Sequence, residues 1–238
     1  AFEKRMIKLL AFDMDGTLID CNARAFIPVY VKAIKDKFGG ELGGLIAKVA
    51  ISGSDAMVHN DGSRTNREAF IEYARPLIPM PMDEFERKMT DFYENEYRAV
   101  SSVIAVKPAM TEAVKELKKR GKKLIVTTNP VFPLPALLFR LRSGGHDPKD
   151  FDFVTSYETS SYAKPEPGYY AETLHRLSLL PEETLIVGND FAEDVCAGKT
   201  VGMKAYYLTD APIPGGDENV KPDFSGTQEE FLAFAKTL

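Results

Sequence analysis

The chain has 238 residues, a formal net charge of −5 and two cysteines, Cys21 and Cys196. The negative balance argues against binding to nucleic acid or to an anionic membrane. Two cysteines so far apart suggest neither a disulfide framework nor a structural zinc site. There is no apolar run of about 18 residues and no signal-peptide pattern. We therefore expect a cytoplasmic protein with a small soluble partner.

Short aliphatic and β-branched runs alternate with helical patterns along most of the chain. This alternation predicts an α/β fold with a doubly wound parallel sheet. Near the end, Thr227 and Glu230 form a capping-box pattern that opens a last helix, expected over residues 231–236. The predicted strands are residues 6–12, 123–127, 151–155, 184–187 and 204–208.

Residues 22–105 are the exception, because they are rich in helix formers and aromatic residues and contain almost no strand-like run. They predict a smaller helical domain inserted after the first strand, so that residues 1–21 and 106–238 form the core. Within the insertion, the glycine cluster at residues 39–44 predicts a flexible connection. The core then resumes with a helix that ends at Gly121.

The stretch AFDMDGTLID, residues 11–20, carries two acids from a buried-looking strand into a tight turn. Burying like charges so close together is costly unless a cation or donors compensate. Polar residues also follow the other strands, and in open α/β sheets these positions meet at the ligand-binding edge. Carboxylates, a hydroxyl and an ammonium group can bind a magnesium ion together with a phosphate. The residues at this edge are Asp13, Asp15, Thr17, Thr128, Asn129, Lys164, Asn189, Asp190 and Asp194.

Four segments resemble, in order, the four motifs of the haloacid dehalogenase (HAD) superfamily. The resemblance covers the whole chain and puts residues 22–105 in the place of the family's helical cap. It implies a Mg²⁺-dependent phosphatase that hydrolyses a small phosphorylated metabolite through an aspartyl-phosphate. The segments are DMDGTL (13–18), VTTN (126–129), Lys164 with Pro165, and VGND (187–190) with Asp194.

The resemblance also implies a role for each matching residue. Asp13 is the nucleophile and Asp15 the general acid and then the general base. Thr128 donates a hydrogen bond to the phosphoryl oxygens, and Lys164 supplies positive charge. Gly16 allows a sharp turn beneath the phosphate. The substrate-binding set is completed by Thr17 and Asn129, and the metal set is Asp13, Asp15 through its main-chain carbonyl, Asp190, and Asp194 in support.

Two assignments within the motifs stay open. In the fourth motif an asparagine follows the glycine where the commonest form has an acid, so Asn189 and Asp190 are alternative direct ligands. Asp190 is preferred because it lies four residues before Asp194. In the second motif Thr127 and Thr128 both offer a hydroxyl, and Thr128 is preferred because an asparagine follows it.

The cap should determine substrate choice, because the motif residues recognise only phosphate. Arg64, in the polar stretch of residues 59–66, is a candidate contact for an anionic substrate, although an exposed interhelix loop is the commoner role of such a stretch. A phosphomutase resembling β-phosphoglucomutase and a non-enzymatic phosphate-binding module are the alternative functions. Dehalogenation is disfavoured because Asp15 supplies the acid/base typical of phosphoryl transfer.

Overall fold

The structure is a computed structural model that describes residues 7–238. Its centre is a six-stranded sheet in the order β5-β4-β1-β6-β7-β8, in which all neighbouring strands run parallel. The predicted α/β fold with a parallel sheet is therefore confirmed; the predicted start of the first strand at residue 6 lies outside the described residues. The strands are β1 (Leu9–Phe12), β4 (Lys123–Val126), β5 (Phe153–Val154), β6 (Thr184–Gly188), β7 (Lys204–Leu208) and β8 (Phe224–Gly226).

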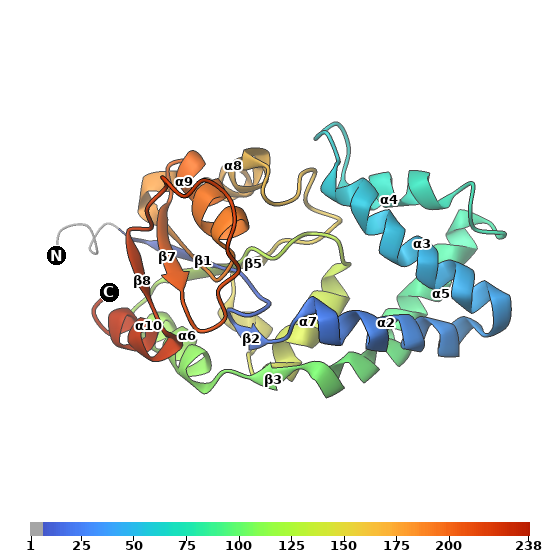
Figure 1. The fold of residues 1–238 in the computed structure, drawn as a ribbon, viewed down its shortest axis with the longest axis horizontal. Helices are drawn as coiled ribbons and strands as arrows, with labels where there is room; N and C mark the ends of the chain where they lie inside the picture. The colour runs from blue at the N-terminus through green and yellow to red at the C-terminus, as the bar shows by residue number, and fades with distance from the viewer. Residues whose placement is uncertain (1–6) are drawn as a thin grey trace.

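Helices cover both faces of the sheet (Figure 1). On one face lie α6 (Pro108–Lys119) and α10 (Gln228–Ala235), and the ring of Phe231 meets that of Phe12 edge-on with centroids 5.8 Å apart. On the other face lie α8 (Pro167–Arg176) and α9 (Ala197–Thr200). The capping box of Thr227 and Glu230 is present. Helix α10 begins at Gln228, directly after the N-cap Thr227 and three residues earlier than predicted.

The inserted segment forms helices on one side of the molecule, at the right of Figure 1. The chain leaves and re-enters the sheet through a two-stranded antiparallel ribbon. The division into a core and a cap domain over residues 22–105 stays a prediction. The elements are the ribbon strands β2 (Ile19–Asp20) and β3 (Ala105–Val106), the helices α2 (Ala23–Phe38), α3 (Gly40–Val58), α4 (Asn66–Ala74) and α5 (Met82–Glu94), and the 3-10 helix η1 (Glu96–Val103).

The prediction of a flexible connection at residues 39–44 is wrong, because α3 begins at Gly40 and only Gly39 separates it from α2. Of these glycines, Gly43 serves close packing. A Cβ on Gly43 would lie 3.0 Å from the backbone of Lys35, so its absence lets the two helix backbones approach.

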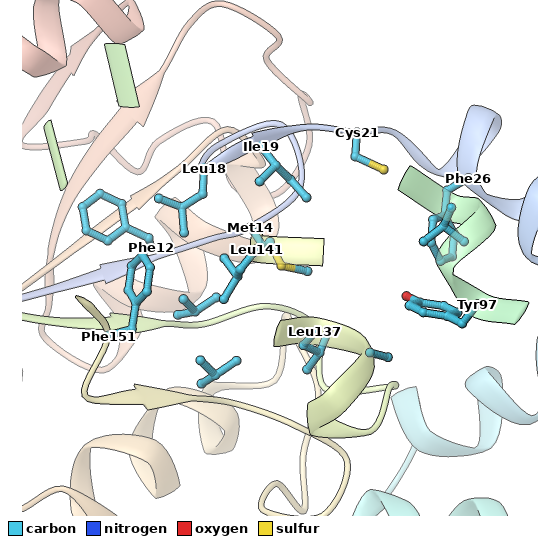
Figure 2. Packing of buried hydrophobic residues seen from close by; sticks show 14 of the residues in the cluster. Phe12, Met14, Leu18, Ile19, Cys21, Phe26, Tyr97, Leu137, Leu141 and Phe151 are labelled. Atoms are coloured by element: carbon cyan, nitrogen blue, oxygen red, sulfur yellow. The ribbon is translucent and has the colours of Figure 1, made fainter. Parts of the chain in front are cut away.

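Apolar packing is continuous from the sheet to the inserted helices. One buried cluster contains Phe12 and Met14 from the first strand and its turn together with Phe26 from α2 and Tyr97 from η1. Figure 2 shows these side chains along one path, with α7 (Leu134–Ser143) supplying Leu137 and Leu141 beside it. The inserted helices are thus packed against the end of the sheet where the polar motif residues lie.

Candidate active site

The first motif forms a tight turn directly after β1. Gly16 has φ +77°, and its amide donates to the carbonyl of Ile19 at 2.9 Å. A Cβ at Gly16 would lie 2.5 Å from the side-chain amide of Asn189, so the position requires glycine for both its conformation and its space. Lys107, a buried residue that the sequence did not single out for this site, donates from Nζ to the Gly16 carbonyl at 2.8 Å and fixes the turn from below.

Lys164 is the cation that neutralises Asp13. Its side chain is 1% exposed, and its Nζ lies 2.9 Å from Asp13 Oδ1 and 2.7 Å from Asp194 Oδ1. Burial lowers the pKa of Lys164, but the two carboxylates outweigh burial and hold it well above its usual value. Burial raises the pKa of Asp194, and Lys164 opposes that rise. The structure therefore places a permanent ammonium group between motifs one and four.

A second cation, Arg140 on α7, neutralises Asp15. The guanidinium is buried, donates to Asp15 Oδ1 and lies over the ring of Phe26, 4.6 Å from its centroid. Burial raises the pKa of Asp15, whose side chain is still 38% exposed, and Arg140 acts against that rise. Burial lowers the pKa of Arg140 and Asp15 raises it, with a net rise, so Arg140 stays charged.

Arg140 was not predicted as a site residue, because the local pattern indicates that it is buried but not which acid it pairs with. Arg140 occupies the same helix face as Ala136, Leu137 and Leu141, all of which are buried. An arginine on the apolar face of a short helix needs a buried acidic partner. The acid that it pairs with, Asp15, lies 125 positions earlier in the chain, so the helix pattern alone does not identify it.

The second motif is supported by polar groups beneath it. The carbonyl of Thr128 accepts hydrogen bonds from Thr155 Oγ1 at 2.9 Å and from Tyr169 Oη at 2.7 Å. Asn129 Oδ1 accepts from the amide of Lys164 at 3.3 Å, which ties the second motif to the third. The hydroxyl of Thr127 is buried and has no hydrogen-bond partner among residues 7–238.

The fourth motif brings Asn189, rather than the carboxylate of Asp190, against motif one. Asn189 Oδ1 lies 3.1 Å from Thr17 Oγ1, whereas Asp190 Oδ1 accepts from the amide of Glu193 at 2.9 Å and caps the π-helix η4 (Phe191–Cys196). The wider turn of a π-helix accommodates the five positions from Asn189 to Asp194, one more than the four from Asp190 to Asp194. Asp194 in turn accepts the Asp190 amide at 3.0 Å and faces Lys164.

The oxygen atoms at motifs one and four fit a magnesium ion. Among residues 7–238 no three His, Cys, Asp or Glu side chains are grouped for a metal, but magnesium also takes amide and main-chain oxygens. Thr17 Oγ1 lies 3.3 Å from Asp13 Oδ2 and 3.1 Å from Asn189 Oδ1, and its single proton can serve only one of these acceptors. Asp13 Oδ2 and Asn189 Oδ1 therefore lie close together, and the Thr17 hydroxyl can donate to only one of them at a time.

One cavity beside the inserted helices reaches the motif residues. It has a volume of about 640 Å³ and is lined by Asp15, Gly16 and Asn189 together with residues of α2 and α3. A second cavity, of about 780 Å³ between α4, α5 and residues 133–135, and a third, of about 310 Å³ along α4, are lined by none of the motif side chains. The cavity of about 640 Å³ is therefore the candidate substrate site.

Arg64 is not brought to this site. It lies on the surface of the inserted helices, 42% exposed, with its Nη1 3.2 Å from Glu72 Oε2, and lines a separate pocket. Its neighbour Asn66, which the sequence analysis did not select, is fully buried instead. Asn66 Nδ2 donates to the carbonyls of Pro130 and Tyr162, both at 3.1 Å, and so joins α4 to the loops of motifs two and three.

A family model of haloacid dehalogenase-like hydrolases matches residues 7–202. The chain belongs to this family. The resemblance described from the four motifs, and with it the prediction of a HAD-superfamily hydrolase, is confirmed.

Relatives of this HAD-family hydrolase carry phosphatase names. A phosphoglycolate phosphatase of Pseudomonas fluorescens is 26% identical over 210 residues, covering 87% of this chain and 71% of the relative. The pyrophosphatase PpaX of Bacillus velezensis is 25% identical over 207 residues, which cover 85% of this chain and 82% of the relative. The solved structure of a HAD phosphatase from Thermococcus onnurineus has the same fold, with a TM-score of 0.61 and 21% identity. The match covers 96% of this chain and 97% of that one.

Within residues 7–238, no helix combines the length and the hydropathy required to span a bilayer.

Proposed function

We propose that the chain is a Mg²⁺-dependent phosphatase that hydrolyses a small phosphate monoester through an aspartyl-phosphate on Asp13. The observation that carries the proposal is the Lys164 ammonium held within 2.9 Å of Asp13 and 2.7 Å of Asp194. The ammonium supplies positive charge beside the proposed nucleophile, where a phosphoryl group would be transferred. The phosphatase names of the relatives support the same reaction class.

In the first step, a carboxylate oxygen of Asp13 attacks phosphorus and the bond to the ester oxygen breaks. Asp15 donates the proton that the leaving oxygen requires, and the raised pKa of Asp15 suits this role. Arg140 donates to Asp15 Oδ1, which leaves Asp15 Oδ2 to carry this proton. Thr128 and Lys164 stabilise the charge on the phosphoryl oxygens.

In the second step, Asp15, now a carboxylate, accepts a proton from water. The water oxygen attacks the phosphorus of the aspartyl-phosphate and the bond between phosphorus and the Asp13 oxygen breaks. The Asp13 carboxylate is regenerated and inorganic phosphate is released. The bond from Arg140 to Asp15 in the present structure matches the carboxylate form required at this stage.

Asp13, the main-chain carbonyl of Asp15 and Asn189 would hold the magnesium ion, with Asp190 as the alternative to Asn189. When bound, the ion supplies positive charge to the phosphoryl oxygens. Asp194 supports the set by holding Lys164 and the Asp190 amide.

The test is phosphate release by the wild type and by Asp13→Asn, with Mg²⁺ and with a chelator. Loss of the nucleophile should lower kcat by at least about 1,000-fold. Asp36→Asn, an exposed position on α2, is the matched control and should keep full activity. Substantial turnover by a folded Asp13→Asn protein would refute the nucleophile assignment. A long-lived phosphoenzyme that requires a bisphosphate would indicate the mutase instead.

A further inference from the structure

The cavity of about 640 Å³ at Asp15 lies where the leaving group of the substrate must sit. Since Asp15 protonates the ester oxygen in the proposed reaction, the group attached to that oxygen extends from Asp15 into this space. The volume is within the usual range for a small-molecule site. The polarity and charge of the residues that line the cavity should therefore indicate which kind of leaving group it binds.

The lining is largely apolar. Phe26 and Ile27 from α2, Ile51 from α3, and Phe132 and Ile213 from two core loops face it. Ile27, Ile51 and Ile213 are 41%, 37% and 49% exposed, and they are three of the seven large apolar side chains that are exposed within residues 7–238. Exposed apolar residues that gather at one cavity mark a binding surface.

Each uncharged polar side chain of the lining that carries an oxygen, namely Asn22, Tyr30, Ser54 and Asn189, already makes at least one hydrogen bond within the protein. Asn22 Oδ1 accepts the Ala25 amide at 3.0 Å and caps α2, and Ser54 Oγ donates to the Ile51 carbonyl at 2.6 Å. Asn189 uses both ends of its amide, towards Thr17 and towards the carbonyl of residue 211. A hydroxyl-rich leaving group such as a sugar would find few free partners for its own hydrogen bonds, which makes its burial costly.

The charges of the lining disfavour an anion. Its ionisable side chains are Asp15, Asp20 and Arg140, which give two carboxylates and one cation. The cation is already paired with Asp15 and covered by the ring of Phe26. A carboxylate or a second phosphate on the leaving group would therefore find no unpaired cation in this lining and would face the carboxylate of Asp20.

We propose that the leaving group is an uncharged, predominantly apolar alcohol, held by Phe26, Ile27, Ile51 and Phe132. The inference rests on the proposed phosphatase reaction and narrows its substrate class. It separates this chain from relatives named for phosphoglycolate and pyrophosphate, whose leaving groups are anionic.

The experiment compares kcat/KM for phosphate esters of primary alcohols, so that the intrinsic reactivity of the leaving group is similar throughout. The apolar series is ethyl, butyl and hexyl phosphate, and the polar set is phosphoglycolate and glucose 6-phosphate. We expect kcat/KM to rise about two- to fourfold per methylene, and hexyl phosphate to exceed both polar esters by at least about 10-fold.

Two variants connect the preference to the cavity. Ile51→Glu should lower kcat/KM for hexyl phosphate by about 10-fold with little effect on ethyl phosphate, and Ile27→Ser should act in the same direction. Leu77→Glu is the matched control, because Leu77 is a 42% exposed residue of the inserted segment that does not line the cavity. Ile27 and Ile51 are partly exposed, so the replacements should fold, which circular dichroism checks.

The outcomes separate the inference from the function on which it rests. Asp13-dependent hydrolysis that is fastest with phosphoglycolate or glucose 6-phosphate, or that does not change in Ile51→Glu, would overturn the apolar leaving group and keep the phosphatase. Absence of Asp13-dependent hydrolysis of every ester would overturn both.

Discussion

Arg140 and Asp15 form an ion pair in which the arginine is buried and the acid faces the substrate cavity. Arg140 therefore acts on the reaction through Asp15 and is a positioning residue. It opposes the effect of burial on the pKa of Asp15 and keeps the carboxylate oriented while the site is empty. Because the Nε of Arg140 is buried and has no hydrogen-bond partner in the described part of the chain, the pair is retained at some cost in stability.

Arg140→Met should move the pH dependence of the enzyme. Without Arg140, only Lys164 still opposes the effect of burial on Asp15, so the pKa of Asp15 rises further and Asp15 remains protonated to higher pH. The alkaline limb of kcat/KM should then shift to higher pH, and kcat near pH 7 should fall about 10-fold because the acid is less well oriented. The measurement is a pH-rate profile with an alkyl phosphate. Arg142→Met, an exposed position on the same helix, is the control, and an equal shift in it would contradict the assignment.

The fourth motif gives a prediction about metal binding. Asn189→Ala should raise the Mg²⁺ dissociation constant about 10-fold, because it removes an oxygen that faces motif one. Asp190→Ala should change Mg²⁺ binding less and instead lower the free energy of unfolding by about 1 kcal/mol, since it removes the cap of η4. Titration calorimetry and urea unfolding measure the two effects. The reverse pattern would identify Asp190 as the direct ligand.

The sequence predicted those parts of the site whose signal is local. Asp13 follows an apolar run directly, and Lys164 precedes a proline at the motif spacing. Arg140 and Lys107 were missed because their partners lie 125 and 91 positions away and are brought together only by packing. Strand β8 was missed for a similar reason: its three residues include a glycine and have no alternating pattern, and parallel pairing with β7 defines it as a strand.

Asn66 should contribute strongly to stability. Asn66→Ala leaves the carbonyls of Pro130 and Tyr162 without a donor, and each loss costs about 1–3 kcal/mol in a buried setting. The free energy of unfolding should therefore fall by about 2–4 kcal/mol, as measured with urea. Asn219→Ala, an exposed asparagine whose side chain bonds only Asp217 among the described contacts, should change it by less than about 0.5 kcal/mol. Equal effects of the two substitutions would show that Asn66 has no special role in joining α4 to the core.

His146 should make stability depend on pH below neutrality. The ring is buried, with its Nε2 2.9 Å from the Leu18 carbonyl, and burial lowers its pKa from the ordinary value of 6.5. The unfolded chain therefore binds a proton at a higher pH than the folded protein does. The stability from the neutral ring is fully present above pH 6.5 and is lost as the pH falls from there towards the folded pKa.

Urea unfolding between pH 5 and 8 can measure this loss, whose slope is at most about 1.4 kcal/mol per pH unit for one proton. His146→Gln keeps a donor for Leu18 and cannot titrate, so its free energy of unfolding should fall less steeply on acidification than that of the wild type. His175→Gln, at an exposed position on α8, should retain the wild-type slope. If His146→Gln loses stability on acidification as steeply as the wild type, the proton that drives the loss binds elsewhere.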